Sequence, residues 1–191
     1  RLMVFSLLLM MIIGGLIAFM AFLWSTRPSP TYFATTSEGA LFRMEPLNKP
    51  FLSERSLNQW AVEAAVASYT HDFVNFRKTL SEIKEYYTVE GYQQFLSAYD
   101  SSNNLEALKS KKLVATAVAL GAPVILSQGL NKEKRYFWVI QLPMKVTYQS
   151  ANEMIPQDIV VKMTVTRVPV WDSARGIAIS SFVAREGRIQ Q

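Results

Sequence analysis

The sequence predicts an α+β fold, in which a helical layer packs on a curved antiparallel sheet of about four strands. Three observations support this prediction: residues 2–24 carry no charge, helical periodicity dominates the middle of the chain, and strand-like alternation dominates its last third. Helices followed by strands favour α+β over alternating α/β. We expect a transmembrane helix (1–24), a proline-containing linker with a hairpin (25–52) and an α+β domain (53–191).

The apolar N-terminal segment is long enough to cross a membrane as a helix. Of the 23 residues from Leu2 to Trp24, 20 are hydrophobic, and a bilayer core requires roughly 20 apolar residues. A signal peptide has a shorter apolar core and a small-x-small cleavage site, which this segment lacks. We therefore expect a retained anchor with Trp24 and Arg27 at the membrane interface. One arginine lies on each side, so charge alone does not decide the orientation.

Three small residues of this segment share one helical face: Gly14, Ala18 and Ala21. Small residues at this spacing let two membrane helices approach closely. Glycine is also common in membrane helices that make no such contact. Both interpretations of this face are open at the level of sequence.

The linker contains four of the eight prolines and a predicted hairpin. Two short β-prone runs, 32–36 and 40–44, flank a Ser-Glu-Gly turn. An isolated two-stranded hairpin is marginally stable in water, so this one should contact its own domain or a neighbouring chain. The residues expected to make such protein contacts are Tyr32, Phe33, Leu41 and Phe42.

Four helices are expected between residues 53 and 112. Ser53 can cap a helix that ends near Tyr69, and Thr88 can cap another. Residues 105–112 form a short fourth helix or extend the third. Between the two capped helices, apolar residues step by three and four and predict an amphipathic helix: Phe73, Phe76, Leu80, Ile83 and Tyr87.

Four strands are expected after residue 112. They cover residues 113–126, 136–149, 159–165 and 177–185. Four prolines lie in or beside these strands, and proline donates no ladder hydrogen bond, so they mark edges, bends or bulges. The second strand has one entirely apolar or aromatic face: Tyr136, Trp138, Ile140, Leu142, Met144, Val146 and Tyr148.

The sequence carries no recognisable catalytic, cofactor-binding or metal site. It has no cysteine and one histidine, which excludes disulfides, thiolate nucleophiles and multi-histidine metal sites within one chain. His71 and Asp72 are adjacent, so on a helix they would not face each other, and a helix break is expected there. The net charge is +5 with scattered cations, so we expect no nucleic-acid partner. The residues predict a membrane-anchored domain that works by interaction.

An ordered series of motifs resembles the DotI/IcmL family of type IVB (Dot/Icm) secretion systems and its conjugative-plasmid relative TraM. The series covers nearly the whole chain, although the residues do not separate the secretion branch from the plasmid-transfer branch. It consists of Tyr32-Phe33-Ala34-Thr35-Thr36, Pro46-Leu47-Asn48-Lys49-Pro50, Trp60-Ala61-Val62-Glu63-Ala64-Ala65, Tyr69-Thr70-His71-Asp72-Phe73-Val74-Asn75-Phe76-Arg77, Gly121-Ala122-Pro123-Val124-Ile125, Val146-Thr147-Tyr148-Gln149-Ser150, Arg167-Val168-Pro169 and Arg175-Gly176-Ile177.

This resemblance implies a single-pass protein of the bacterial inner membrane, with a cytoplasmic N-terminus and a periplasmic domain. The implied domain has a nuclear-transport-factor-two-like fold, similar to that of the VirB-type assembly factor. The family forms homo-oligomers, can include a shorter DotJ-like paralogue, and carries no known enzymatic site or cofactor. The expected function is therefore non-enzymatic assembly of a secretion or conjugation apparatus through contacts with its other subunits and membrane lipid.

Two alternatives stay open from the residues alone. The first is a membrane-anchored sensor or ligand-binding domain, because curved folds can enclose a pocket. The second is an isomerase-type enzyme, which would need an acid or tyrosine aimed into that pocket, and it rests on fold analogy alone. The candidates for that role are Tyr86, Tyr136 and Asp158.

Overall fold

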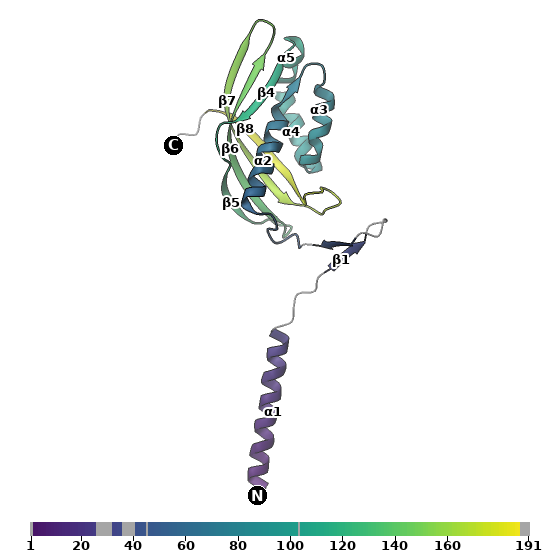
Figure 1. Cartoon of the computed structure of the whole chain (residues 1–191), viewed down its shortest axis with the longest axis vertical. Helices are drawn as coiled ribbons and strands as arrows, with labels where there is room; N and C mark the ends of the chain where they lie inside the picture. The colour runs from purple at the N-terminus through teal and green to yellow at the C-terminus, as the bar shows by residue number, and fades with distance from the viewer. Residues whose placement is uncertain (1, 26–31, 36–40, 45, 103, 188–191) are drawn as a thin grey trace. The chain divides into compact units, whose positions relative to one another are not determined.

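The chain forms two compact units, residues 1–45 and 46–191, and each is described by itself. The computed structural model describes residues 2–25, 32–35, 41–44, 46–102 and 104–187 (Figure 1).

The first unit contains one long helix and a two-stranded hairpin. Helix α1 covers Leu2–Ser25, and strands β1 (Tyr32–Thr35) and β2 (Leu41–Met44) pair antiparallel, as the sequence predicts. Over the residues that the structure describes, no helix combines the length and the apolar character needed to cross a membrane. The transmembrane role of residues 1–24 therefore stays a prediction.

Two side-chain caps begin the main helices of the second unit. Helix α2 (Glu54–Tyr69) starts where the Ser53 hydroxyl accepts a hydrogen bond from the Ser56 amide. Helix α4 (Val89–Ser101) starts where the Thr88 hydroxyl accepts one from the Gly91 amide, 3.0 Å away. Both predicted caps are confirmed. The short helix α5 (Asn104–Ser110) is separate from α4.

The single amphipathic helix expected over residues 73–87 is wrong. The chain instead forms β3 (His71–Asp72), a turn, helix α3 (Phe76–Glu82) and the 3-10 helix η1 (Ile83–Tyr86). The turn forms because the Asp72 carboxylate accepts hydrogen bonds from the amides of Val74 and Asn75. The predicted helix break at His71-Asp72 is confirmed.

Helices α2, α3, α4 and α5 lie on one side of a curled antiparallel sheet (Figure 1). The α+β prediction is confirmed, but the described sheet has six strands rather than about four, in the order β3-β4-β6-β7-β8, with β5 also paired to β6. Its remaining strands are β4 (Val114–Ala119), β5 (Val124–Leu130), β6 (Tyr136–Gln149), β7 (Met154–Arg167) and β8 (Ile177–Glu186).

The apolar run 113–126 forms two strands because β4 and β5 share one edge of β6. Pro143 lies where that edge passes from one strand to the other. Its carbonyl accepts a hydrogen bond from the Leu120 amide, just after the last β4 pair and before the first β5 pair. Proline has no N–H group to donate to a neighbouring strand. At Pro143 the missing donor falls at the gap between β4 and β5, so neither strand loses a ladder hydrogen bond.

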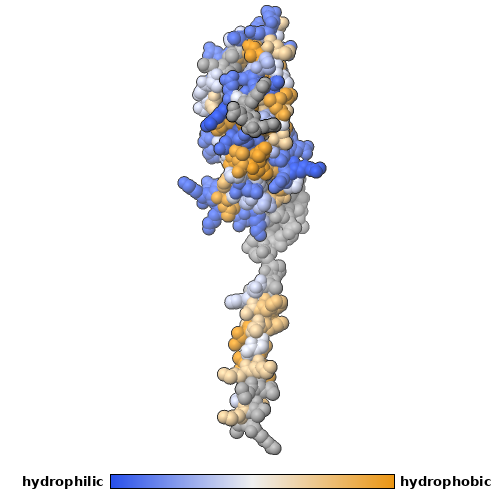
Figure 2. Space-filling model, turned by 90° about the vertical axis from the view of Figure 1, so that its left-hand side faces the viewer, coloured by the Kyte–Doolittle hydropathy of each residue, from blue (hydrophilic) through white to orange (hydrophobic). Residues whose placement is uncertain are grey.

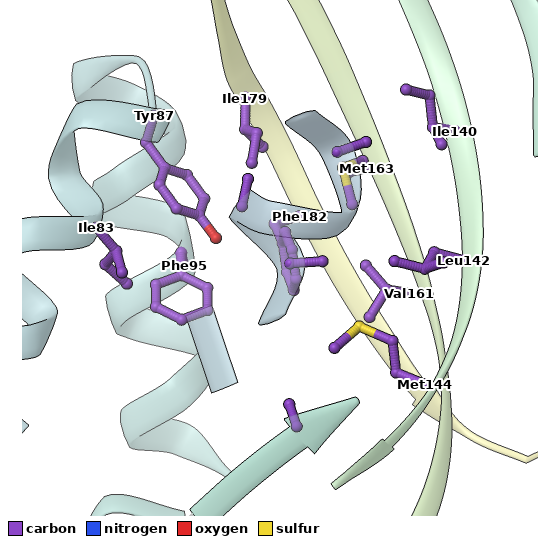
Figure 3. Close-up of a cluster of buried hydrophobic side chains, with 14 of the residues drawn as sticks. Ile83, Tyr87, Phe95, Ile140, Leu142, Met144, Val161, Met163, Ile179 and Phe182 are labelled. Carbon is purple, nitrogen blue, oxygen red and sulfur yellow. The ribbon is translucent and has the colours of Figure 1, made fainter. Parts of the chain in front are cut away.

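The hydrophobic core lies between the helices and the inner face of the sheet. The predicted apolar face of β6 is confirmed, since its members from Trp138 to Val146 are at most 2% exposed. Figure 3 shows Tyr87 and Phe95 from the helical side meeting Phe182 and the β6–β7 side chains. Each fully buried large apolar side chain contributes roughly 1.5–3 kcal/mol, so this layer supplies most of the stability.

The outer face of the sheet is mixed in character. Val118 and Val124 are each about half exposed there. Figure 2 views the domain from this side, where apolar residues form small areas separated by hydrophilic ones.

Candidate interaction surface

A groove of about 810 Å³ crosses the surface beside the end of α3. Its walls are η1, the start of α4 and the loop after β7, residues 168–176. Because these segments are far apart in sequence, only folding brings them together. We call this hollow the acidic groove, for the side chains described next.

Carboxylates outnumber cations around the acidic groove. The cations are Lys84 and Arg135, and Arg135 already pairs with Glu133 outside the groove, at 3.4 Å. The acidic side chains that line the groove are Glu82, Glu85, Glu90 and Asp172. The groove therefore presents a net negative surface.

An exposed tryptophan stands at the rim of the groove. Trp171 is 69% exposed, and a large aromatic side chain in that state is characteristic of contact surfaces. Its loop is ordered by internal hydrogen bonds, from the Asp172 amide to the Pro169 carbonyl (3.0 Å) and from the Gly176 amide to the Ser173 carbonyl (2.8 Å). The ring is thus presented on a defined turn.

A buried arginine fixes both ends of this loop. The Arg167 guanidinium donates a hydrogen bond to the Gly176 carbonyl at 2.9 Å and lies 4.1 Å from the centre of the Phe51 ring. Gly176 has a φ of +63°, and a Cβ there would meet the Arg167 guanidinium. The same guanidinium donates to the Pro46 carbonyl at 3.5 Å, so residues 46–51 are bound to the domain.

A second hollow of about 260 Å³ continues the groove past η1 and shares Glu85 and Asp172 with it. Here the Tyr86 hydroxyl donates to the Glu63 carboxylate at 3.0 Å, and Arg175 pairs with the same carboxylate at 3.4 Å. Partial burial, and then the Glu63 carboxylate, raise the pKa of Tyr86 to about 12. Tyr86 is therefore a neutral hydrogen-bond donor at physiological pH.

The three residues considered for an acid or base role are not brought together. Tyr86 lies in this second hollow, Tyr136 packs on Trp138 with ring centres 5.0 Å apart, and Asp158 pairs with Lys145. Tyr136 and Lys145 are nine residues apart on β6, which is roughly 30 Å along a strand. Tyr136 and Asp158, the partner of Lys145, are therefore too far apart to act as a catalytic pair.

The sole histidine is part of the core. His71 is 2% exposed, and its Nε2 atom lies 2.9 Å from the Ser68 carbonyl oxygen. Burial lowers the pKa of this imidazole, so it is neutral near pH 7. In the part of the chain that the structure describes, no cluster of three or more histidine and acidic side chains is able to hold a metal ion.

The residues that the sequence marked for contacts lie in the first unit, and the described hollows are lined by residues of the second unit. Gly14, Ala18, Ala21 and Trp24 are exposed on α1. The hairpin places Ala34 opposite Phe42 and Phe33 opposite Arg43. Arg27 lies outside the described residues, and so do the side chains of the four hairpin residues Tyr32, Phe33, Leu41 and Phe42.

Sequence reasoning missed the acidic groove. Its one local signal was the apolar Val168-Pro169-Val170-Trp171 run, which precedes a strand and has neither helical nor alternating period. The carboxylates of the groove give no such signal because they are spread over α3, η1, α4 and the loop after β7.

The domain is thus a curled antiparallel sheet covered on one side by helices, with a charged groove at its surface. Residues 7–186 match the family described as the type-IV b secretion system inner-membrane complex component, DotI/IcmL, and the chain belongs to this family. The expected resemblance is thereby confirmed. The comparison with curated proteins finds no match.

Solved structures agree with this assignment. The periplasmic domain of DotI is 47% identical, with a TM-score of 0.70 over 72% of this chain and 99% of that chain. A periplasmic fragment of TraM is 25% identical, with a TM-score of 0.67 over 72% of this chain and 100% of that chain. VirB8 of Agrobacterium tumefaciens shares only the fold, at 10% identity and a TM-score of 0.52 over 75% of this chain and 100% of that chain.

Proposed function

We propose that this chain is a non-enzymatic subunit of the inner-membrane complex of a type IVB secretion or conjugation apparatus, and that it works through protein contacts. Membership of a family of complex components supports the setting. The observation that carries the mechanism is the acidic groove with Trp171 exposed at its rim. The fold places these groups at a surface rather than in an enclosed cavity.

The chemistry of the groove selects a cationic partner segment. Glu85, Glu90 and Asp172 attract lysine or arginine side chains, and complementary charge speeds encounter and sets register. Trp171 can take a guanidinium or ammonium group on its ring face, an interaction worth about 0.5–2 kcal/mol. The partner is therefore a basic segment of another subunit of the apparatus.

The remaining parts of the proposal concern the first unit. Residues 2–24 anchor the chain in the inner membrane, with the N-terminus cytoplasmic and residues 46–191 periplasmic. The uncharged composition of residues 2–24 supports this anchoring. Homo-oligomers, or mixed oligomers with a shorter DotJ-like paralogue, then form through the small-residue face of α1 and through the hairpin.

The second unit, residues 46–191, has the nuclear-transport-factor-two-like architecture.

Reversing the charge of the groove tests the proposal. The double variant Glu85→Lys/Asp172→Lys is expressed in the native host, membranes are washed with alkaline carbonate, and the complex is purified after mild solubilisation. The chain should stay in the washed membranes, and the variant should recover at least about tenfold less of its partner subunits, the effect of losing roughly 1.4 kcal/mol of binding.

The matched control is Glu106→Lys/Glu153→Lys, which also reverses two charges, at exposed positions that do not line the groove. It should recover partners as the unaltered chain does. Equal recovery by the groove variant and the control would contradict the groove as the contact site. Release of the chain by carbonate would contradict the anchor.

A further inference from the structure

A third hollow lies apart from the acidic groove, between the ends of α2 and α4 and strands β6, β7 and β8. Its volume is about 220 Å³, the size of a small organic molecule rather than a peptide. Its floor is apolar and comes from Phe95, Ile159 and Phe182. Figure 3 shows Phe95 and Phe182 next to each other on the inner side of the sheet.

Three tyrosines line this pocket, and their hydroxyls lack protein partners. Among the described hydrogen bonds there is none from the hydroxyl of Tyr69, Tyr99 or Tyr148. Tyr99 is 95% buried, being 5% exposed. None of the three hydroxyl oxygens is a fully buried unpaired atom, so all three reach the pocket surface, where they can donate to water or a ligand.

Three tyrosines outside this pocket do have a hydroxyl partner. The Tyr87 hydroxyl lies 2.7 Å from the Ser68 hydroxyl, and the Tyr92 hydroxyl donates to the Leu80 carbonyl at 2.7 Å. The Tyr86 hydroxyl donates to Glu63. Among the tyrosines whose side chains are described, four hydroxyls have no hydrogen bond, and three of these four, those of Tyr69, Tyr99 and Tyr148, line one pocket, whereas Tyr136 lies elsewhere on β6.

The three phenols act as donors. Burial raises the pKa of each of Tyr69, Tyr99 and Tyr148 above its ordinary value, so all three stay protonated at neutral pH. Tyr69 and Tyr99 lie in edge contact, with ring centres 6.4 Å apart, and Tyr148 is close enough to both to raise their pKa values further. Arg185 adds a cation to the lining, while Glu186 is its only acid.

We propose that this pocket binds a small carboxylic acid with a flat apolar body, whose carboxylate accepts hydrogen bonds from the phenols of Tyr69, Tyr99 and Tyr148. The aromatic floor takes the apolar body, and ring pairs at 4.5–7 Å are favourable. A carboxylate offers several acceptor sites and no donor when ionised, which matches a lining with three phenol donors. This binding activity is separate from the contacts made at the acidic groove.

Calorimetric titration of the purified full chain with sodium benzoate tests the proposal. Benzoate should bind, and Tyr99→Phe and Tyr148→Phe should each weaken binding about tenfold or more, as expected for a hydrogen bond to a charged acceptor. Tyr92→Phe, which removes a hydroxyl outside the pocket, should bind as the unaltered chain does. Cyclohexylammonium, a cation of similar size, should not bind.

A second variant keeps the test independent of the buried tyrosines. Ala98 lines the pocket from an exposed position, so Ala98→Phe fills it from the rim and should abolish benzoate binding with the core intact. Absence of benzoate binding to the unaltered chain would overturn the proposal. Binding that survives Tyr99→Phe, Tyr148→Phe and Ala98→Phe would overturn it as well. Neither result bears on partner recovery at the acidic groove.

Discussion

Replacing Gly91 with alanine should separate α4 from the sheet. A Cβ at this position would collide with the Ile179 carbonyl oxygen and lie 3.1 Å from two backbone atoms of Ser180. Ile179 accepts a hydrogen bond from the Thr88 amide at 2.9 Å, so the colliding atom is held in place. Backbone cannot rotate away as a side chain can, and α4 must therefore move.

The expected loss follows from three terms. Overpacking costs about 1–3 kcal/mol, and loss of the Thr88–Ile179 hydrogen bond costs about 1 kcal/mol. Alanine regains about 1 kcal/mol through its higher helix propensity. The net destabilisation is therefore about 1–3 kcal/mol, which lowers the melting temperature by roughly 2–12 °C.

Urea unfolding of the full chain in mild detergent measures this change. Tryptophan fluorescence reports on the core because Trp60 and Trp138 are each 2% exposed. The control is Gly129→Ala, where a Cβ would meet only Phe137 at an ordinary 3.8 Å, so stability should not fall. A Gly91→Ala variant as stable as the unaltered chain would refute the close approach of α4 to β8.

Two further predictions concern buried charge and protonation. Arg167→Met should lower the free energy of unfolding, measured in urea, by about 2–4 kcal/mol, because it removes the hydrogen bond to Gly176 and the contact with Phe51. The control is Arg175→Met at an exposed position, which should lower it by under about 1 kcal/mol. The folded-state pKa of His71 is lowered, so the unfolded chain protonates first and stability should fall as the pH drops below about 6.5. Urea midpoints should fall from pH 7.5 to 5.5, and an equal fall in His71→Gln would contradict this.

Local signals were sufficient where a residue acts within its own segment. Ser53 and Thr88 begin helices because their hydroxyls bond amides three residues ahead, a distance that sequence spacing sets directly. The β6 strand was predicted at its observed bounds because its apolar face alternates over 14 residues. These signals need no knowledge of the rest of the fold.

Local signals failed where two conformations satisfy the same pattern. The three-and-four spacing from Phe73 to Tyr87 fits a helix, but Asp72 binds two amides of the next turn, and Tyr87 forms a bridge to Ile179. The apolar run 113–126 was predicted as one strand, but β4 and β5 lie on either side of Gly121 and Pro123, which interrupt it. In both segments the observed conformation depends on pairing with strands that lie further along the sequence, β8 for Tyr87 and β6 for β4 and β5.

The sequence by itself determined the α+β class, the uncharged N-terminal segment, the main caps and the absence of cysteine chemistry. These properties depend on composition and on spacings of a few residues. Tertiary structure alone decided the six-stranded sheet, the acidic groove and the tyrosine pocket. The groove joins η1 to the loop of Trp171, and the pocket joins Tyr69, Tyr99 and Tyr148. Such sites require segments far apart in sequence to meet, and only packing of the whole core determines which of them do.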